Sequence, residues 1–275
     1  MDGGPVLVNA SGPGGRRRLD VLFTPADFAA LSRRDLSRTT CVVFDVLRAT
    51  TSMVTALSAG AEAIVPVSDI PEALAWRSRL PEVLLAGERD GRRILADRTG
   101  GVDFDLGNSP REFVSDRVGG RWIVATTSNG TRALRASVGA RVVLPACLRN
   151  RSAVARWLHA DTSEEWVLVC SGTLEDSAYE DVLGAGALVD RLWPMLTEFE
   201  VLDGARMARL MYLAANGDMA GAMRQHSRNG RRLARMEELA ADIEICAAED
   251  DLDLVASMDG GGVIRRLTER NQSLE

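Results

Sequence analysis

The chain has 275 residues, of which 46% are hydrophobic and 26% charged, a composition typical of a globular protein. Its net charge of −6 argues against a nucleic-acid partner, because wholesale phosphate binding needs a basic face. All 33 basic residues are arginine, so the chain cannot carry a P-loop lysine, a Schiff-base lysine or lysine-bound pyridoxal phosphate.

Short β-branched runs alternate along the chain with helix-length stretches in which apolar residues recur at helical spacing. The predicted strands cover residues 19–23, 40–46, 63–67, 82–86, 121–126, 141–145, 165–170, 252–257 and 262–267. The predicted helices cover residues 49–59, 70–79, 129–138, 150–159 and 177–193, and capping boxes are expected at Thr24 and Ser109. This alternation predicts an α/β fold, in which helices on both faces of a mostly parallel or mixed sheet make a three-layer α/β/α arrangement.

The remaining segments complete a single predicted domain over residues 19–270. Residues 1–18 are rich in glycine, proline and then arginine, and we expect a flexible arm there. Residues 88–109 form a Gly/Asp-rich loop that is too long for a simple connection and is a candidate functional loop. The arginine-rich residues 206–250 are predicted to be helical, as a covering layer or as a contact in a homo-oligomer.

Cysteine usage and hydropathy predict a cytoplasmic protein with no membrane partner. No apolar run approaches the ~20 residues that span a bilayer, and the N-terminus lacks the apolar core of a signal peptide. The four cysteines form no CxxC pair, which disfavours a zinc knuckle and a disulfide framework; they are Cys41, Cys147, Cys170 and Cys246.

Three similar polar clusters follow predicted strands, at residues 45–52 (DVLRATTS), 126–132 (TTSNGTR) and 170–177 (CSGTLEDS). Parallel strands end at one edge of a sheet, where ligands of α/β proteins bind. Each cluster supplies hydroxyls and free backbone N–H groups at a helix N-terminus, which attract an anion. Arg48 and Arg132 add fork-shaped donors suited to phosphate or sulfonate oxygens. Together the clusters predict an oxyanion pocket.

Carboxylates accompany these clusters: Asp45 ends a strand, Glu88 follows another, and Glu180 and Asp181 lie about one turn into a helix. Acidic groups beside a bound anion repel it unless a cation lies between them, and Mg²⁺ prefers carboxylate and phosphate oxygens. The alternative is that these acids cap helices or pair with arginines. Their clustering with the hydroxyl groups favours a magnesium site.

Other phosphatase chemistries lack their residues in this chain. A cysteine phosphatase needs Cys-x5-Arg, but Leu47 stands at that offset from Cys41 and no other cysteine fits. A phosphoaspartate enzyme needs Asp-x-Asp and a lysine, but Asp45-Val46-Leu47 does not fit and the chain has no lysine. The Arg-His-Gly of a phosphohistidine enzyme is absent. Metal-assisted attack by water remains.

Six stretches also match a known family, in the family's order. They are DVLRATTS (45–52), GERDGRRI (87–94), FDLGNSP (104–110), TTSNGTRAL (126–134), GTLEDSAYEDVLGAGALVDRL (172–192) and SRNGRRL (227–233). On these stretches the chain resembles the 2-phosphosulfolactate phosphatases of coenzyme M biosynthesis. The resemblance implies an α/β fold and a Mg²⁺-dependent enzyme that converts 2-phosphosulfolactate into sulfolactate and phosphate.

The chain departs from the family at one loop. Members usually carry a Gly-Arg pair where this chain has the acidic residues Glu175 and Asp176. We therefore expect no strong preference for a sulfonated substrate over its carboxylate analogue.

The chemistry of these clusters assigns roles within a phosphatase domain of residues 19–270. The predicted catalytic residues are Asp45, Arg48, Glu88 and Asp181, and the predicted Mg²⁺ ligands are Asp45, Glu180 and Asp181. The predicted phosphate cradle consists of Thr50, Thr51, Asn108, Thr127, Ser128, Asn129, Thr131 and Arg132. Two alternatives stay open: a binding module that holds an anionic metabolite without turnover, and a phosphatase for a different small phosphorylated acid.

Overall fold

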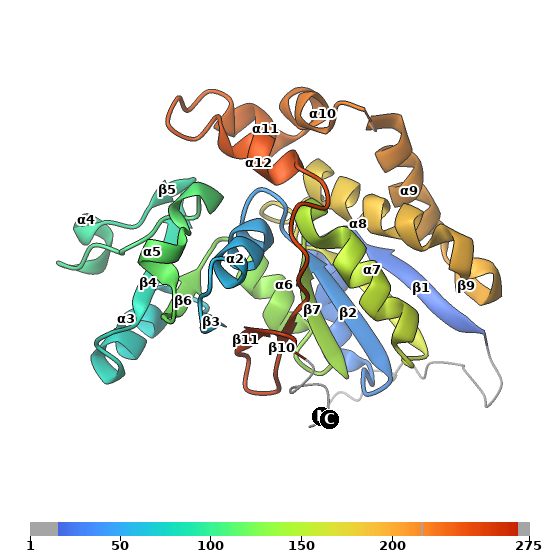
Figure 1. Ribbon diagram of the computed structural model, residues 1–275, viewed down its shortest axis with the longest axis horizontal. Helices are drawn as coiled ribbons and strands as arrows, with labels where there is room; N and C mark the ends of the chain where they lie inside the picture. Colours follow the sequence, from blue (N-terminus) through green and yellow to red (C-terminus); the bar gives the residue numbers. More distant parts are fainter. Residues whose placement is uncertain (1–15, 216, 269–275) are drawn as a thin grey trace, which may run out of the picture.

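The computed structural model describes residues 16–268 with the exception of residue 216. The described residues form an eleven-stranded mixed sheet with the strand order β5-β4-β6-β3-β11-β10-β7-β2-β8-β1-β9 (Figure 1). The strands are β1 (Arg17–Leu22), β2 (Thr39–Phe44), β3 (Ala63–Pro66), β4 (Leu84–Arg89), β5 (Arg92–Arg93), β6 (Trp122–Thr126), β7 (Val142–Ala146), β8 (Glu165–Cys170), β9 (Phe199–Val201), β10 (Ala256–Met258) and β11 (Ile264–Arg266).

The helices follow the predicted stretches closely in the first 193 residues. They are α1 (Pro25–Ala29), α2 (Ala49–Ser58), α3 (Ile70–Arg79), α4 (Ala96–Thr99), α5 (Ser115–Val118), α6 (Gly130–Ala136), α7 (Arg151–Ala160), α8 (Tyr179–Leu192), α9 (Asp203–Ala215), α10 (Met219–His226), α11 (Arg228–Leu233) and α12 (Asp242–Ala247). The short elements β5, β9, α4 and α5 have too few residues for a periodic pattern and were not predicted.

The sheet consists of two parallel groups joined by an antiparallel hairpin. Strands β4, β6 and β3 are parallel to one another, as are β7, β2, β8, β1 and β9. Hairpin β10–β11 pairs with β7 through Met258 and Val143 and with β3 through Ile264 and Ile64. The predicted final strand pair is therefore confirmed, and it connects the two groups.

The core lies on both faces of the larger group. Every residue of β2 and β8 is buried, as expected for strands covered on both sides. On one face, Val42 and Phe44 belong to a cluster with apolar residues of α7, α8 and α9. On the other face, Cys41 and Val43 belong to a cluster with α1, α2 and α6. This alternation confirms the predicted three-layer α/β/α fold.

The two predicted capping boxes have different outcomes. Thr24 Oγ1 accepts a hydrogen bond from the Asp27 backbone N–H at 3.3 Å, and Asp27 Oδ2 accepts one from the Thr24 N–H at 2.9 Å, so this capping box is confirmed. The prediction at Ser109 is wrong, because Pro110–Glu112 is a 3₁₀ turn without a side-chain cap. The Ser109 hydroxyl instead donates to Asp242 at 2.6 Å.

The N-terminal boundary lies earlier than predicted. Strand β1 begins at Arg17, so Arg17 and Arg18 of the predicted arm (residues 1–18) belong to the sheet, while its residues 1–15 lie outside the described residues. The single-domain assignment stays a prediction. Within residues 16–268, leaving out residue 216, none of the helices combines the length and the apolar character needed to cross a bilayer.

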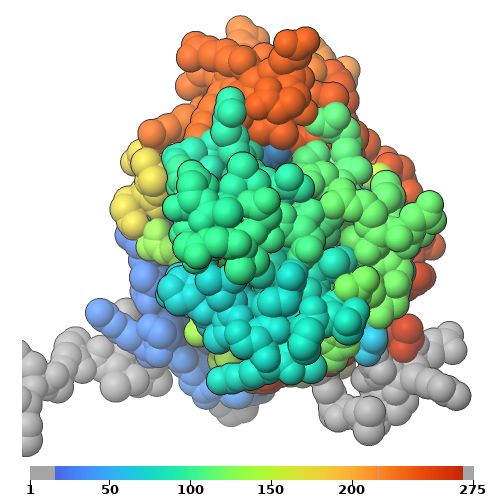
Figure 2. Space-filling model, turned by 90° about the vertical axis from the view of Figure 1, so that its left-hand side faces the viewer, coloured from blue at the N-terminus to red at the C-terminus, as the bar shows by residue number. Residues whose placement is uncertain are grey.

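The helical C-terminal segment has two parts. Helix α9 packs on α8 through Ala208 and Tyr212 and leaves Met207 and Leu210 exposed; an oligomer contact there stays a prediction. Helices α10, α11 and α12, here called the roof, lie above the strands at the end of the molecule that carries the site (Figure 1). Figure 2 shows the roof in orange above the green and teal residues that follow β3. The predicted covering layer is confirmed for the roof.

Candidate active site

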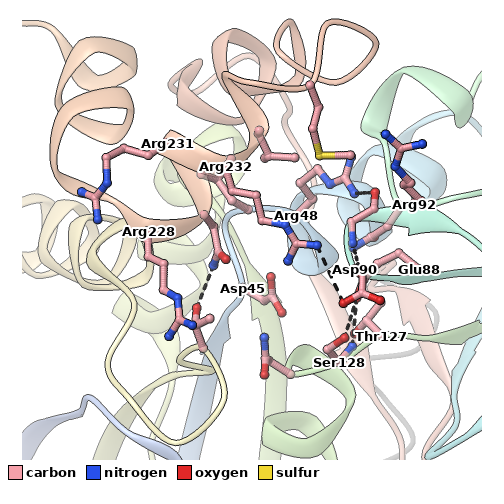
Figure 3. A pocket seen from close by; sticks show the side chains of 18 of the residues that line it. Asp45, Arg48, Glu88, Asp90, Arg92, Thr127, Ser128, Arg228, Arg231 and Arg232 are labelled. Atoms are coloured by element: carbon pink, nitrogen blue, oxygen red, sulfur yellow. Dashed lines mark hydrogen bonds and ion pairs between the residues drawn. The ribbon is translucent and has the colours of Figure 1, made fainter.

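A cavity of about 880 Å³ lies between the roof and the C-terminal ends of β2, β4, β6 and β8. Asp45 follows β2, Glu88 lies near the end of β4, Ser128 follows β6 and Thr173 follows β8. Figure 3 shows Asp45 and Ser128 below α11, with Arg232 of that helix facing them. The predicted convergence of these strand ends is therefore confirmed.

Asp45 lies at the start of two helices. Its Oδ1 accepts a hydrogen bond from the Ala49 backbone N–H of α2 at 3.0 Å. Its Oδ2 lies against Gly130 at the start of α6, where an added Cβ would be only 2.7 Å from that oxygen. Only glycine allows this approach, so the Asn129-Gly130 pair of the TTSNGTRAL stretch brings the start of α6 to the carboxylate.

The environment of Asp45 makes it a proton acceptor near neutral pH. Burial raises the pKa of Asp45 from 3.8 to about 7, and the nearby charges of Glu180 and Glu88 act in the same direction. The N–H groups of Ala49 and Gly130 oppose this rise in pKa. A general base is most effective when its pKa lies near the working pH.

We expect the raised pKa of Asp45 to destabilise the folded protein as the pH increases. Between about pH 4 and pH 7 the unfolded chain has lost this proton while the folded protein keeps it, so the free energy of unfolding falls. Asp45→Asn removes this titrating group. In metal-free buffer the free energy of unfolding of the variant, relative to that of wild type, should therefore rise by about 1–3 kcal/mol between pH 4 and pH 8. Urea unfolding across this pH range checks the prediction, and parallel curves for the two proteins would contradict it.

Glu88 joins two walls of the cavity. Its Oε2 accepts from the Gly91 backbone N–H at 2.7 Å, within the β4–β5 hairpin. Its Oε1 accepts from the backbone N–H of Ser128 at 3.1 Å and from the Ser128 hydroxyl at 2.9 Å. The predicted functional loop at 88–109 therefore contributes to the cavity through this hairpin.

Arg48 is almost completely buried, with 3% of its surface exposed, and lies at the cavity wall. Its Nη1 donates to Asp242 at 2.6 Å and its Nη2 donates to the Gly91 carbonyl oxygen at 2.6 Å. Asp242 is fully buried and also accepts from Ser109 and from Arg111. A guanidinium has five N–H donors, so these two bonds leave donors for a ligand.

Glu180 and Asp181 are buried beside the cavity but do not line it. Asp181 accepts from the backbone N–H groups of Val46 at 2.8 Å and Gly172 at 3.1 Å. Glu180 accepts from the Ser227 hydroxyl and from Asn229 Nδ2, both at 2.6 Å. Burial raises the pKa of both carboxyl groups. Both acids therefore connect loops and helices, which is the alternative role considered for them.

The predicted cradle residues divide into two sets. Buried hydroxyls donate to backbone carbonyls of their own loops: Thr50 to Asp45, Thr51 to Val46 and Thr131 to Thr127. The cavity is instead lined by Asn108, Thr127, Ser128 and Asn129. The Thr127 hydroxyl is buried without a hydrogen-bond partner among the described residues. Arg132 lies outside the cavity lining, paired with Glu175 at 3.0 Å.

The carboxylates that face the cavity are Asp45, Glu88 and Asp90. Within residues 16–268, residue 216 aside, no three His, Cys, Asp or Glu side chains are grouped as a metal site. Mg²⁺ is commonly bound by only one or two carboxylates together with substrate phosphate and water. Asp45 and Glu88 are compatible with that kind of site, whereas the predicted ligands Glu180 and Asp181 do not line the cavity.

The arginines of α11 and of the turn after it were not predicted as site residues. Arg228, Arg231, Arg232 and Arg235 line the cavity, together with Arg92 of the β4–β5 hairpin. The sequence from SRNGRRL (227–233) to Arg235 could have indicated them, because arginines at 228, 231, 232 and 235 recur with the spacing of one helical face.

Comparisons with known proteins agree with the motif pattern. The family described as 2-phosphosulpholactate phosphatase matches residues 27–261. A probable 2-phosphosulfolactate phosphatase of Caldanaerobacter subterraneus subsp. tengcongensis is 36% identical over 244 residues, covering 87% of this chain and 96% of the relative. One from Deinococcus radiodurans is 44% identical over 207 residues, covering 75% of this chain and 82% of the relative. One from Synechococcus sp. is 39% identical over 239 residues, covering 82% and 91%. The chain belongs to the 2-phosphosulfolactate phosphatase family.

Proposed function

We propose that the protein hydrolyses the phosphate monoester of 2-phosphosulfolactate to give sulfolactate and inorganic phosphate. The relatives that carry this name match most of the chain. The observation that supports the proposal most directly is the division of charge in one cavity, with Asp45 and Glu88 on the strand side and several arginines on the roof side. A small phosphorylated acid has anionic groups at both ends and suits such a cavity.

Asp45 is the proposed proton acceptor of the reaction. Its carboxylate faces the cavity, and burial raises its pKa to about 7, where it can take a proton from an attacking water at neutral pH. Arg48 and the Thr127 hydroxyl lie at the same wall with donors available for phosphate oxygens. Hydrogen bonds from these donors would hold the phosphoryl group beside Asp45 and stabilise the charge that develops on it.

Mg²⁺ is the proposed cofactor, with Glu88 as its protein ligand and Asp45 beside it as the proton acceptor. Both carboxylates face the cavity, and a carboxylate there suits a hard cation that also binds phosphate oxygens. When bound, the ion would neutralise negative charge between carboxylates and phosphate and would lower the pKa of a bound water.

The four cysteines support a cytoplasmic location for this reaction. Cys41, Cys147, Cys170 and Cys246 are free and buried, as is common in a reducing compartment.

Release of inorganic phosphate tests the proposed function. We expect the purified protein to release phosphate from 2-phosphosulfolactate with Mg²⁺, and chelation by EDTA to abolish the release. Because a guanidinium pairs with either a sulfonate or a carboxylate, kcat/KM for phosphoglycerate should lie within about a thousand-fold of that for phosphosulfolactate, or roughly 4 kcal/mol. Binding without any release of phosphate would instead support the non-catalytic binding module.

A further inference from the structure

Four arginines form a stripe along α11 and the turn that follows it. Arg228, Arg231, Arg232 and Arg235, here called the arginine stripe, are spaced at i, i+3, i+4 and i+7 and all line the cavity. In Figure 3, Arg228, Arg231 and Arg232 extend from α11, and Arg232 is the one that faces Asp45 and Asp90.

The uncharged residues of the SRNGRRL stretch, Ser227, Asn229 and Gly230, hold α11 in this orientation. Ser227 caps the helix by accepting from the Gly230 N–H at 2.8 Å, and its hydroxyl donates to Glu180 at 2.6 Å. Asn229 Nδ2 donates to Glu180 at 2.6 Å and to Thr173 at 2.7 Å. At Gly230 an added Cβ would lie only 2.2 Å from the Met223 carbonyl oxygen. The SRNGRRL stretch thus has two sets of residues: one anchors the helix and the other faces the cavity.

The charge of the arginine stripe is only weakly neutralised by the protein. Arg228 lies 3.7 Å from Asp176 and Arg232 lies 3.9 Å from Asp90, and these long pairs join side chains that are about half or more exposed. Exposed ion pairs of this kind contribute little. Among the described residues, Arg231 and Arg235 form no ion pair, although Arg231 Nη1 donates to the backbone carbonyl oxygens of Gln225 at 3.1 Å and His226 at 2.9 Å. Like charges at helical spacing repel each other, so an anion in the cavity would stabilise the stripe.

The acidic residues of the loop after β8, Glu175 and Asp176, pair with arginines beside the cavity. Glu175 pairs with Arg132 outside the cavity lining, and Asp176 lies beside Arg228 at the start of the stripe. The loop after β8 therefore presents no arginine of its own to the cavity. Within the described residues, the arginines between α10 and α12 that line the cavity are those of the stripe.

We propose that the arginine stripe binds the end of the substrate that carries the sulfonate and carboxylate groups, so that the phosphoryl group is directed towards Asp45. This orientation rests on the proposed function. Guanidinium groups bind such oxyanions through pairs of N–H donors. The opposite orientation would bring the phosphoryl group to the roof, away from the proton acceptor Asp45 and from Glu88.

Binding of sulfolactate tests the stripe directly, because sulfolactate carries the proposed end of the substrate and no phosphate. We expect the double variant Arg232→Gln/Arg235→Gln to raise the Kd of sulfolactate, measured by calorimetry, by roughly ten- to a hundred-fold. The matched control is Arg224→Gln on α10, which removes an arginine that pairs with Glu244 and does not line the cavity. The Kd of this control variant for sulfolactate should stay within about twofold of the wild-type value.

A second measurement separates the two ends of the substrate. Para-nitrophenyl phosphate has a phosphate group but no second anion, so the double variant should hydrolyse it with nearly wild-type kcat/KM. With phosphosulfolactate the same variant should show a raised KM and a nearly unchanged kcat, since it loses binding of a part that does not react. Thermal unfolding of each variant verifies that the substituted protein is folded.

The outcomes distinguish this inference from the proposed function. Weaker sulfolactate binding in the double variant, with the control unchanged, supports the role of the stripe. If wild type also releases no phosphate from phosphosulfolactate, the proposed function is overturned but the role of the stripe is not. Sulfolactate binding that is undetectable in wild type, or equally tight in the double variant, would overturn the inference. Equal loss of activity towards both phosphate esters would also overturn it.

Discussion

Asp45→Asn is expected to lower kcat for phosphate release by at least about a hundred-fold, which corresponds to roughly 2.7 kcal/mol of transition-state stabilisation. The substitution keeps the shape of the side chain at the starts of α2 and α6 but removes the carboxylate that accepts a proton. Phosphate release under saturating substrate, with added Mg²⁺, measures the effect.

The control for Asp45→Asn is Asp116→Asn, which changes an exposed aspartate in the first turn of α5, outside the cavity lining. This variant should keep wild-type kcat. Without metal, Asp45→Asn should bind inorganic phosphate as well as wild type or slightly more tightly, because a repulsive carboxylate has gone. Normal turnover in the variant would rule out the assigned role of Asp45. Hydrolysis by the wild type in excess EDTA would rule out the magnesium proposal.

Asp242→Asn is expected to destabilise the protein by about 3–5 kcal/mol, because it leaves the buried Arg48 guanidinium without its counter-charge. Asp242 is fully buried and accepts from Arg48 at 2.6 Å, from Ser109 at 2.6 Å and from Arg111 at 2.8 Å. Urea unfolding measures the change in free energy. Activity should fall as well, because Arg48 reaches the cavity wall from this pair.

The matched control is Asp253→Asn, which removes the acidic partner of Arg156 in an exposed pair, with side chains 61% and 85% exposed. An exposed pair contributes about 0–1 kcal/mol, so this variant should be close to wild type. Combining Asp242→Asn with Arg48→Gln should restore part of the lost stability, because the uncompensated charge is then absent. If Asp242→Asn cost less than about 1 kcal/mol, the ion pair would not hold the roof.

Two buried carboxylates attach the roof to the rest of the molecule. Glu180 binds Ser227 and Asn229 at the start of α11, and Asp242 at the start of α12 binds Arg48 and Ser109. Both carboxylates lie outside the cavity lining, yet each fixes the position of groups that line it. Acidic residues near the site thus divide into those that face the ligand space and those that hold the walls of that space together.

The layered fold and the edge of the sheet that carries the candidate site follow from local sequence patterns. Buried β-branched runs and helical spacing are local patterns, and they predicted β2, α2, β8 and α8 to within about two residues. The convergence of Asp45, Glu88 and Ser128 also followed from the sequence, because strands that run parallel must end at the same edge of the sheet.

Which side chains face the cavity depends on contacts between distant parts of the chain. Glu180 and Asp45 have the same chemistry in the sequence, but the donors that surround each depend on residues far away in the chain, such as Ser227 and Asn229 for Glu180. Arg48 and Asp242 are separated by 194 positions, so no local pattern could reveal their pairing. The arginine stripe was visible as a helical spacing, but its direction depends on how α11 packs over the strand ends. Local patterns specify elements, whereas the choice between a ligand contact and a structural contact depends on burial and on partners that only folding brings together.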